Sequence, residues 1–195
     1  MTLDIRILRG DELDSALDAV AELRITVFRD WPYLYDGDLD YERGYLDHYR
    51  ENPDAIVVGA YDGDTLVGAS TGLPLEGHDD GFAAAFAETG LDLSRIFYCA
   101  ESVLLPDYRG QGAGHAFFDA REAHARATGF DSCCFCAVIR PDDHPRRPAT
   151  YRPLDTFWVG RGYARLSGVI AKFEWKDIGE PAETAKPLQF WMRKL

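Results

Sequence analysis

The sequence lacks a long apolar run. No stretch of roughly 18 consecutive apolar residues occurs, so we expect no membrane-spanning helix and no membrane partner. The start, residues 1–6, lacks the basic residues and apolar core of a signal peptide, which leads us to expect a cytoplasmic protein. Basic residues are also scarce, with 21 Lys and Arg against 33 Asp and Glu. The absence of a basic stripe with interleaved aromatic residues argues against nucleic acid as a partner.

Cysteine is scarce and clustered. The chain has four cysteines, and Cys133 and Cys136 form a Cys-x-x-Cys pair. A metal site would need a second pair or suitably spaced histidines, and a redox pair would need a helix N-terminus. Three of the four instead lie in the apolar run 131–139, which is typical of a buried strand. We therefore predict structural thiols and no metal.

The length of 195 residues, 46% of them hydrophobic, suits a single globular domain over 1–195. Charge is uneven along this domain. Residues 1–100 hold 7 Lys and Arg against 21 Asp and Glu, whereas residues 101–195 hold 14 against 12. A polyanionic ligand would suit the second half and a cationic substrate the first, the alternative being a solvated acidic surface.

A glycine-rich corner organises the second half. An apolar, β-rich run over 96–105 is followed by a turn at Pro106, a corner at 109–114 and an amphipathic helical pattern that ends near Thr128. Glycines let the backbone approach a ligand, and the first N–H groups of a helix have no intrahelical partner. The pattern predicts a phosphate or pyrophosphate site.

Two common phosphate motifs do not fit this corner. A P-loop requires Gly-x4-Gly-Lys-Ser/Thr, and no Lys-Ser/Thr follows Gly110 at that spacing. The dinucleotide fingerprint Gly-x-Gly-x-x-Gly fits at Gly110 and Gly112 but meets His115 at its third glycine. The string that remains is Arg109-x-x-Gly112-x-Gly114.

The predicted elements follow the order β-α-α-β-β-β-α-β-α-β-β. The Asp-Gly turn at residues 62–64 predicts a hairpin, and residues 82–86 suggest one further short helix. The main elements are expected at 3–8, 11–29, 41–50, 55–61, 65–75, 96–105, 113–128, 131–139, 154–161, 164–175 and 187–195.

The string at Arg109 resembles the (Arg/Gln)-x-x-Gly-x-(Gly/Ala) signature of the GNAT superfamily of N-acetyltransferases. The element order, including a late helix that ends at Gly162-Tyr163, resembles the GNAT fold over essentially the whole chain. Glu101-Ser-Val-Leu and Lys186-Pro-Leu-Gln-Phe-Trp191 are similar to a bacterial-type branch, which implies no particular substrate. The resemblance implies an α/β (α+β) fold with a mixed, curved central sheet of about seven strands and helices on both sides. It also implies acetyl-CoA as co-substrate.

The same resemblance assigns the coenzyme site. The backbone at Val103, Leu104 and Leu105 would bind the pantetheine arm, with Val103 and Leu105 as the hydrogen-bonding residues. The corner would hold the pyrophosphate, where Arg109 suits phosphate oxygens best. His115 could add a donor or be an ordinary first-turn residue. The corner residues are Arg109, Gly110, Gln111, Gly112, Ala113, Gly114 and His115.

Glu101 is the candidate general base. A lysine-like amine has a pKa near ~10.4 and is mostly ammonium at neutral pH, so transfer requires a group that takes its proton. Glu101 is the charged residue in the apolar run 96–105, just before the expected pantetheine contacts. A charge there is costly without a purpose or a partner. The alternative is a glutamate that pairs with a buried arginine or turns outward.

The general acid departs from the family pattern. Many relatives carry a tyrosine four residues before the closing glycine of the late helix, but here that position is Trp158. An indole N–H is not a useful acid, and packing in the core suits Trp158 and Phe157 better. Tyr151 could protonate the departing thiolate, or coenzyme A could leave as thiolate and take a proton from solvent.

The loop 33–37 supplies the expected acceptor site. Tyr33, Tyr35 and Asp36 are poor core residues on a loop but suit a pocket wall. We expect transfer to a primary amine of a small or peptidic, cationic acceptor. A catalytically silent acyl-CoA-binding module is the alternative, and a dinucleotide-dependent oxidoreductase is disfavoured by His115. A homodimer through exposed edge strands is plausible.

Overall fold

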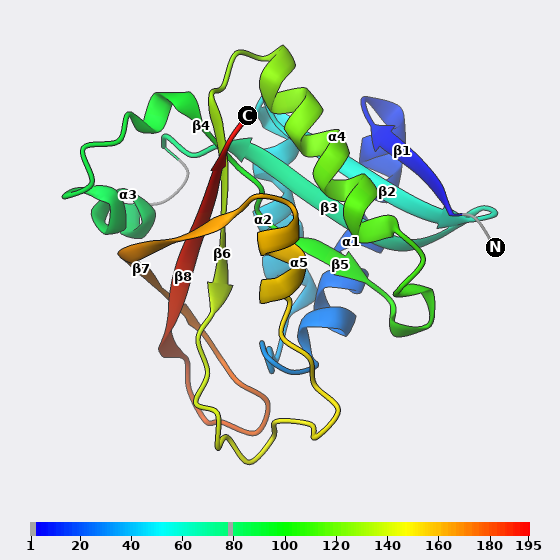
Figure 1. Cartoon of the computed structure of the whole chain (residues 1–195). Helices are drawn as coiled ribbons and strands as arrows, with labels where there is room; N and C mark the ends of the chain where they lie inside the picture. The colour runs from blue at the N-terminus through cyan, green and yellow to red at the C-terminus, as the bar shows by residue number, and fades with distance from the viewer. Residues whose placement is uncertain (1–2, 78–79) are drawn as a thin grey trace.

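A single open, curved sheet forms the centre of the fold (Figure 1). The computed structural model describes residues 3–77 and 80–195. The strands lie in the order β1-β2-β3-β4-β6-β8-β7, and β5 also pairs with β3. Their bounds are β1 Asp4–Leu8, β2 Ile56–Asp62, β3 Thr65–Pro74, β4 Ile96–Tyr98, β5 Ser102–Leu104, β6 Ser132–Val138, β7 Ala164–Trp175 and β8 Thr184–Lys194.

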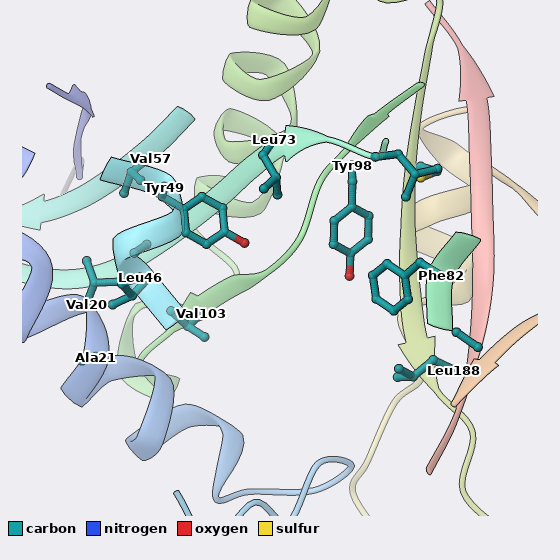
Figure 2. Packing of buried hydrophobic residues seen from close by; sticks show 14 of the residues in the cluster. Val20, Ala21, Leu46, Tyr49, Val57, Leu73, Phe82, Tyr98, Val103 and Leu188 are labelled. Atoms are coloured by element: carbon teal, nitrogen blue, oxygen red, sulfur yellow. The ribbon is translucent and has the colours of Figure 1, made fainter. Parts of the chain in front are cut away.

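Helices cover both faces of this sheet (Figure 1). They are α1 Asp11–Phe28, α2 Leu39–Glu51, α3 Asp80–Phe86, α4 Ala113–Ala127 and α5 Asp155–Gly160, with 3-10 turns at Leu93–Arg95 and Pro106–Tyr108. Alternate strand residues point to opposite faces. Val57 packs in the cluster of α1, α2 and α3, part of which Figure 2 shows, whereas Val58 packs with Phe117 and Phe118 of α4. The predicted fold class is confirmed.

Several element boundaries differ from prediction. The carboxylate of Asp38 accepts the N–H of Tyr41 at 3.0 Å, so α2 begins at Leu39, earlier than the predicted start at residue 41. Tyr45 and Tyr49 of this helix face inward, whereas Tyr41 is 53% exposed. The last strand begins at Thr184 instead of 187, because its pairing with β7 extends to that residue.

The largest difference lies in the run 96–105, predicted as one strand. It forms two strands, β4 parallel to β6 and β5 antiparallel to β3. Between them, Ala100 N–H donates to Thr71 O (3.1 Å) while Thr71 N–H donates to Glu101 O (3.1 Å). Ala100 and Glu101 therefore both lie opposite Thr71 of β3. This is a β-bulge, and it turns β5 away from β6 (Figure 1). The sheet opens at that point.

A buried arginine holds the bulge in place. Arg121 of α4 is 1% exposed, and its Nη1 donates to Glu101 O (2.9 Å) and Thr71 O (3.2 Å). Its Nη2 donates to Ser102 Oγ at 2.9 Å. The guanidinium therefore binds one carbonyl group from each of the two paired segments at the bulge, and this fixes the opening between β5 and β6.

Candidate active site

A cleft of about 1770 Å³ lies at the opening of the sheet. One wall is formed by β5 and the start of α4, and another by β6 and α5. Loops 30–38 and 140–155 close the remaining sides. The cleft brings the predicted glycine corner, Glu101, Tyr33, Tyr35, Asp36 and Tyr151 to one cavity.

The glycine corner has the conformation that an anion site requires. Gly110 (φ +76) and Gly112 (φ +89) adopt left-handed backbone angles, which residues with a Cβ rarely adopt. A Cβ added at either would meet no atom within 4 Å, so the space beside both is open. Gly112 is the N-cap of α4 and offers no capping side chain. The first-turn N–H groups can thus bind an external anion.

The polar side chains of the glycine corner already have hydrogen-bond partners within the protein. Arg109 Nε donates to Leu104 O (3.2 Å), and Gln111 Nε2 donates to Asp107 O (3.3 Å). The Nδ1 of His115 lies 3.1 Å from Arg161 Nη1, and its ring packs on Phe157. His115 is therefore tied to the end of α5.

The backbone of β5 has one paired side. Leu105 N–H donates to Val67 O (3.0 Å), so this donor is used within the sheet. In an antiparallel ladder alternate residues turn their N–H and C=O groups the same way, which directs Val103 toward β3 as well. The groups of Ser102 and Leu104 face the opposite side. Val103 and Leu105, which the sequence predicts as the pantetheine contacts, therefore turn these groups toward β3, whereas Ser102 and Leu104 turn theirs away from it.

Glu101 lies in a buried ion cluster that borders the cleft. Its side chain is buried, and it pairs with Arg24 of α1. The Nε of Arg24 pairs with Glu42 of α2, which is 0% exposed. The hydroxyl of Tyr45 donates to Glu101 Oε2 (3.2 Å) and lies 2.9 Å from that of Tyr49. Glu101 thus has the arginine partner considered above, and it also lines the cleft.

Burial and charge act together on this cluster. Burial alone would lower the pKa of Arg24, but the charges of Glu101 and Glu42 outweigh it and raise that pKa well above its usual value. Burial, followed by the charge of Glu101, raises the pKa of Tyr45 well above the usual value. Arg24 stays a cation and Tyr45 a neutral donor, so one guanidinium serves two carboxyl groups.

The acceptor loop, residues 31–37, is fastened to the far end of the sheet. Arg140 Nε donates to Pro32 O (2.8 Å) and its Nη2 to Tyr33 O (2.6 Å). Arg140 also forms an ion pair with Asp177 at 2.7 Å. Burial raises the pKa of Asp177, but hydrogen bonding and the charges of Arg140 and Lys186 hold it below its usual value.

Two predicted acceptor residues have partners within the protein. The carboxylate of Asp36 lies 2.7 Å from Lys176 Nζ and 3.3 Å from Arg29 Nη1. Tyr35 interacts with the carboxyl group of Glu42. Burial, followed by the charge of Glu42, raises the pKa of Tyr35. Tyr35 therefore links the acceptor loop to the ion cluster.

The aromatic residues near α5 divide between cleft and core. Trp158 lines the cleft but packs on Phe135 (4.9 Å between ring centroids) and Trp191 (5.2 Å). Tyr151 is half-buried, 5.9 Å from the ring of Trp31. Burial raises the pKa of Tyr151, which keeps its hydroxyl protonated at neutral pH.

The cysteines form part of the core. Cys99, Cys133 and Cys134 are buried, while Cys136 is half-buried with its Sγ 3.2 Å from Tyr98 Oη. Burial raises the pKa of Cys136 to about 12, so this thiol is not a ready nucleophile. In residues 3–77 and 80–195, no group of three or more His, Cys, Asp or Glu side chains is placed to hold a metal ion.

Sequence reasoning did not find Arg24, Glu42 and Arg121. Each lies on an amphipathic helix, where a charged residue usually faces solvent. Their contacts join elements distant in sequence, as between Arg24 and Glu101 or Arg121 and Thr71. The one available signal was the buried acid at Glu101, which required a partner.

A strand edge that faces a cleft and leads into a glycine-opened helix N-terminus can bind an extended ligand that carries a phosphate group. The profile of the Acetyltransferase (GNAT) family matches residues 18–152, and the chain belongs to this family of acetyltransferases. Acetyl-CoA is therefore its acetyl donor. The resemblance of the Arg109 string to the GNAT signature is confirmed at family level. Across the helices that the structure describes, none is long and apolar enough to cross a membrane.

Solved structures share the fold. A ribosomal-protein-alanine N-acetyltransferase from Brucella melitensis has a TM-score of 0.66 at 14% identity, covering 99% of this chain and 100% of that one. A proposed acetyltransferase from Salmonella typhimurium, yncA, was solved with its cofactor acetyl-CoA. Its TM-score is 0.61 at 13% identity, over 100% of this chain and 95% of that one. No curated protein has a significant sequence match.

Proposed function

We propose that the protein is an N-acetyltransferase that transfers the acetyl group of acetyl-CoA to a primary amine, with Glu101 as general base. The observation that carries this proposal is the position of Glu101. Its carboxylate borders the cleft at the residue immediately before β5, whose backbone groups at Ser102 and Leu104 point away from β3. A base there would meet an amine that approaches the thioester.

The coenzyme would bind along backbone groups. The N–H and C=O of Ser102 and Leu104 suit the amides of the pantetheine arm, which would add to β5 as a strand does. The N–H groups from Gly110 to Gly114 suit the pyrophosphate. Arg109 could release Leu104 O and pair with a phosphate, because its guanidinium would then bind an anion instead of a neutral carbonyl group. His115 would support this turn through Arg161.

Acetyl-CoA supplies an activated acetyl thioester, and the chain supplies orientation and proton transfer. The acceptor's ammonium loses a proton to the Glu101 carboxylate, and the free amine attacks the carbonyl carbon. A C–N bond forms, the C–S bond breaks with its electron pair leaving on the coenzyme A sulfur, and the nitrogen loses its remaining extra proton to solvent to give the amide. Tyr151, protonated at neutral pH, is the side chain in the cleft we assign to protonate that thiolate, solvent being the alternative.

The acceptor side favours a cation. Two carboxyl groups, Glu42 and Glu101, share Arg24, which leaves one negative charge beside the cleft. The aromatic rings of Tyr33 and Phe28, 4.6 Å apart, also line this side. An ammonium group on a small molecule or at a peptide N-terminus would be attracted by the charge and packed by the rings.

The first test is a calorimetric titration with acetyl-CoA, with NADH in parallel. We expect binding of acetyl-CoA alone, and a protein that bound only NADH would contradict the whole assignment. Thiol release from acetyl-CoA, measured with lysine, 1,4-diaminobutane and an alanyl peptide as acceptors, would then identify the amine class.

Replacing the proposed base separates chemistry from binding. Glu101→Gln should lower kcat about 100-fold or more, because a positioned general base contributes at least that much. Its Kd for acetyl-CoA should stay within a factor of two. If Glu101→Gln instead abolished acetyl-CoA binding, Glu101 would be structural.

A catalytically silent acyl-CoA-binding module is the second candidate, favoured by Trp158 at the usual tyrosine position and by the ion pair of Glu101. It would bind acetyl-CoA normally but release thiol at the same rate in wild type and Glu101→Gln.

A further inference from the structure

We propose that Glu42 is a positioning residue for acetyl transfer, acting on Glu101 through the guanidinium of Arg24. The inference rests on the proposed function. It assigns a role to a side chain of α2 that is 0% exposed and places an acidic group in the protein interior. A buried acid of this kind is costly unless a partner or a function compensates.

The geometry divides one cation between two acids. Arg24 presents its Nε to Glu42 and its Nη1 to Glu101, so different edges of one guanidinium are occupied. Tyr35 contacts Glu42 and Tyr45 contacts Glu101, which orients both carboxyl groups. Across residues 3–77 and 80–195, Arg24 is the only Lys or Arg in ion-pair contact with either acid. Arg121 contacts Glu101 at the main-chain oxygen and forms no ion pair with its carboxylate.

Charge balance explains why the second acid matters. Arg24 with Glu101 alone would be a neutral pair, and a neutralised carboxylate attracts an ammonium weakly and takes its proton reluctantly. With Glu42 present, the three groups carry one excess negative charge in a site of low dielectric. An incoming ammonium completes the balance, and Glu42 keeps Arg24 from being drawn wholly to Glu101.

The decisive variant is Glu42→Gln. Glutamine has the same shape and keeps an oxygen for Arg24 Nε and Tyr35, so only the charge is removed. We expect kcat/KM for 1,4-diaminobutane, measured as thiol release from acetyl-CoA, to fall about tenfold or more, with an unchanged Kd for acetyl-CoA. Asp47→Asn is the matched control: it removes one charge from the same helix at an exposed pair with Arg50 and should leave turnover unchanged.

A double-mutant cycle distinguishes positioning from a separate effect. If Glu42 acts through Glu101, then Glu42→Gln should have little further effect in the Glu101→Gln background. Multiplying effects, or a Glu42→Gln rate equal to wild type, would overturn the proposal. Tyr35→Phe removes only the hydroxyl that interacts with Glu42. It should give a smaller fall in kcat/KM and serves if Glu42→Gln does not fold.

The cycle also tests the proposed function separately. Wild-type turnover that does not depend on Glu101 would remove the general base, and this inference with it. Turnover that depends on Glu101 but not on Glu42 would overturn the positioning role alone.

Discussion

At the scale of single residues, the site depends on a few backbone conformations and one buried cation. Gly110 and Gly112 have positive φ and open space beside them, which the anion site requires. Arg24 orients the proposed base from α1, a helix whose other buried residues pack in the hydrophobic core. The corner is thus recognisable from sequence, whereas the cation is recognisable only in three dimensions.

Gly112→Ala should weaken both the fold and coenzyme binding. A left-handed residue with a Cβ costs about 1–2 kcal/mol, which urea unfolding would measure. Because the N-cap would shift to relieve this strain, acetyl-CoA affinity by calorimetry should fall about tenfold or more.

Gly129→Ala is the matched control for this corner. Gly129 follows the other end of α4 with φ +91 and equally open space, so the stability loss should be similar. Acetyl-CoA affinity should be unchanged, and an equal loss of affinity in both variants would show that the corner has no special role.

The residues that the sequence predicted are those with a local signal, and the residue it missed depends on contacts between segments distant in sequence. Gly112 and Glu101 were found because local pattern shows them: a glycine where a helix opens, and a charge within an apolar run. Glu42 was not found, because its sequence neighbours are those of an ordinary solvent-facing helix. Its burial follows from how α1 packs against α2, which local pattern does not encode.

At the scale of elements, the acceptor loop is held by the distant segment at Arg140. Trp175 Nε1 donates to Tyr33 O (3.0 Å), and Asp36 N–H donates to Lys176 O (2.9 Å), so β7 and its following loop also take part. A loop fastened at several points presents a fixed wall to a substrate.

Arg140→Met should loosen this wall. Loss of a largely buried guanidinium leaves Asp177 and two carbonyl groups without it, so we expect a loss of about 3–5 kcal/mol in unfolding free energy. The KM for the amine should rise while acetyl-CoA affinity persists. Arg29→Met removes an exposed pair with Asp36 and should cost less than about 1 kcal/mol. Equal losses in both variants would argue against the anchoring role of Arg140.

The elements themselves were largely predictable from hydrophobic period and turn residues. The hairpin at Asp62 and the helix after Gly112 confirm this. The break between β4 and β5 was not predictable, because the run 96–105 is apolar apart from Glu101 and Ser102 and contains no glycine or proline to indicate a bulge. The bulge depends on Arg121, which reaches it from α4.

At the scale of the whole molecule, buried tyrosines make the fold sensitive to alkali. Burial is the largest cause that raises the pKa of Tyr33, Tyr45, Tyr49, Tyr98 and Tyr163. In the unfolded chain each has a pKa near ~10. A raised folded-state pKa adds stability below that value, and this stability is lost as pH rises beyond it.

Spectrophotometric titration would check this sign. Of the ten tyrosines in the sequence, we expect these five, together with Tyr35, whose pKa burial also raises, to form tyrosinate only as far-UV circular dichroism is lost. The absorbance should rise in two phases, the second together with unfolding. A single reversible phase near pH ~10 with the fold intact would contradict the prediction.

The bulge at Thr71 has a consequence for how such proteins diverge. The opening it creates consists of main-chain geometry: two carbonyl groups, a strand edge and a turn of glycine backbone. Side chains along this opening can be replaced while the shape of the opening is retained. Structures with 13–14% identity can therefore keep the fold over nearly their entire length. Evolution here retains the shape of the backbone, while the amino-acid sequence that forms it can change.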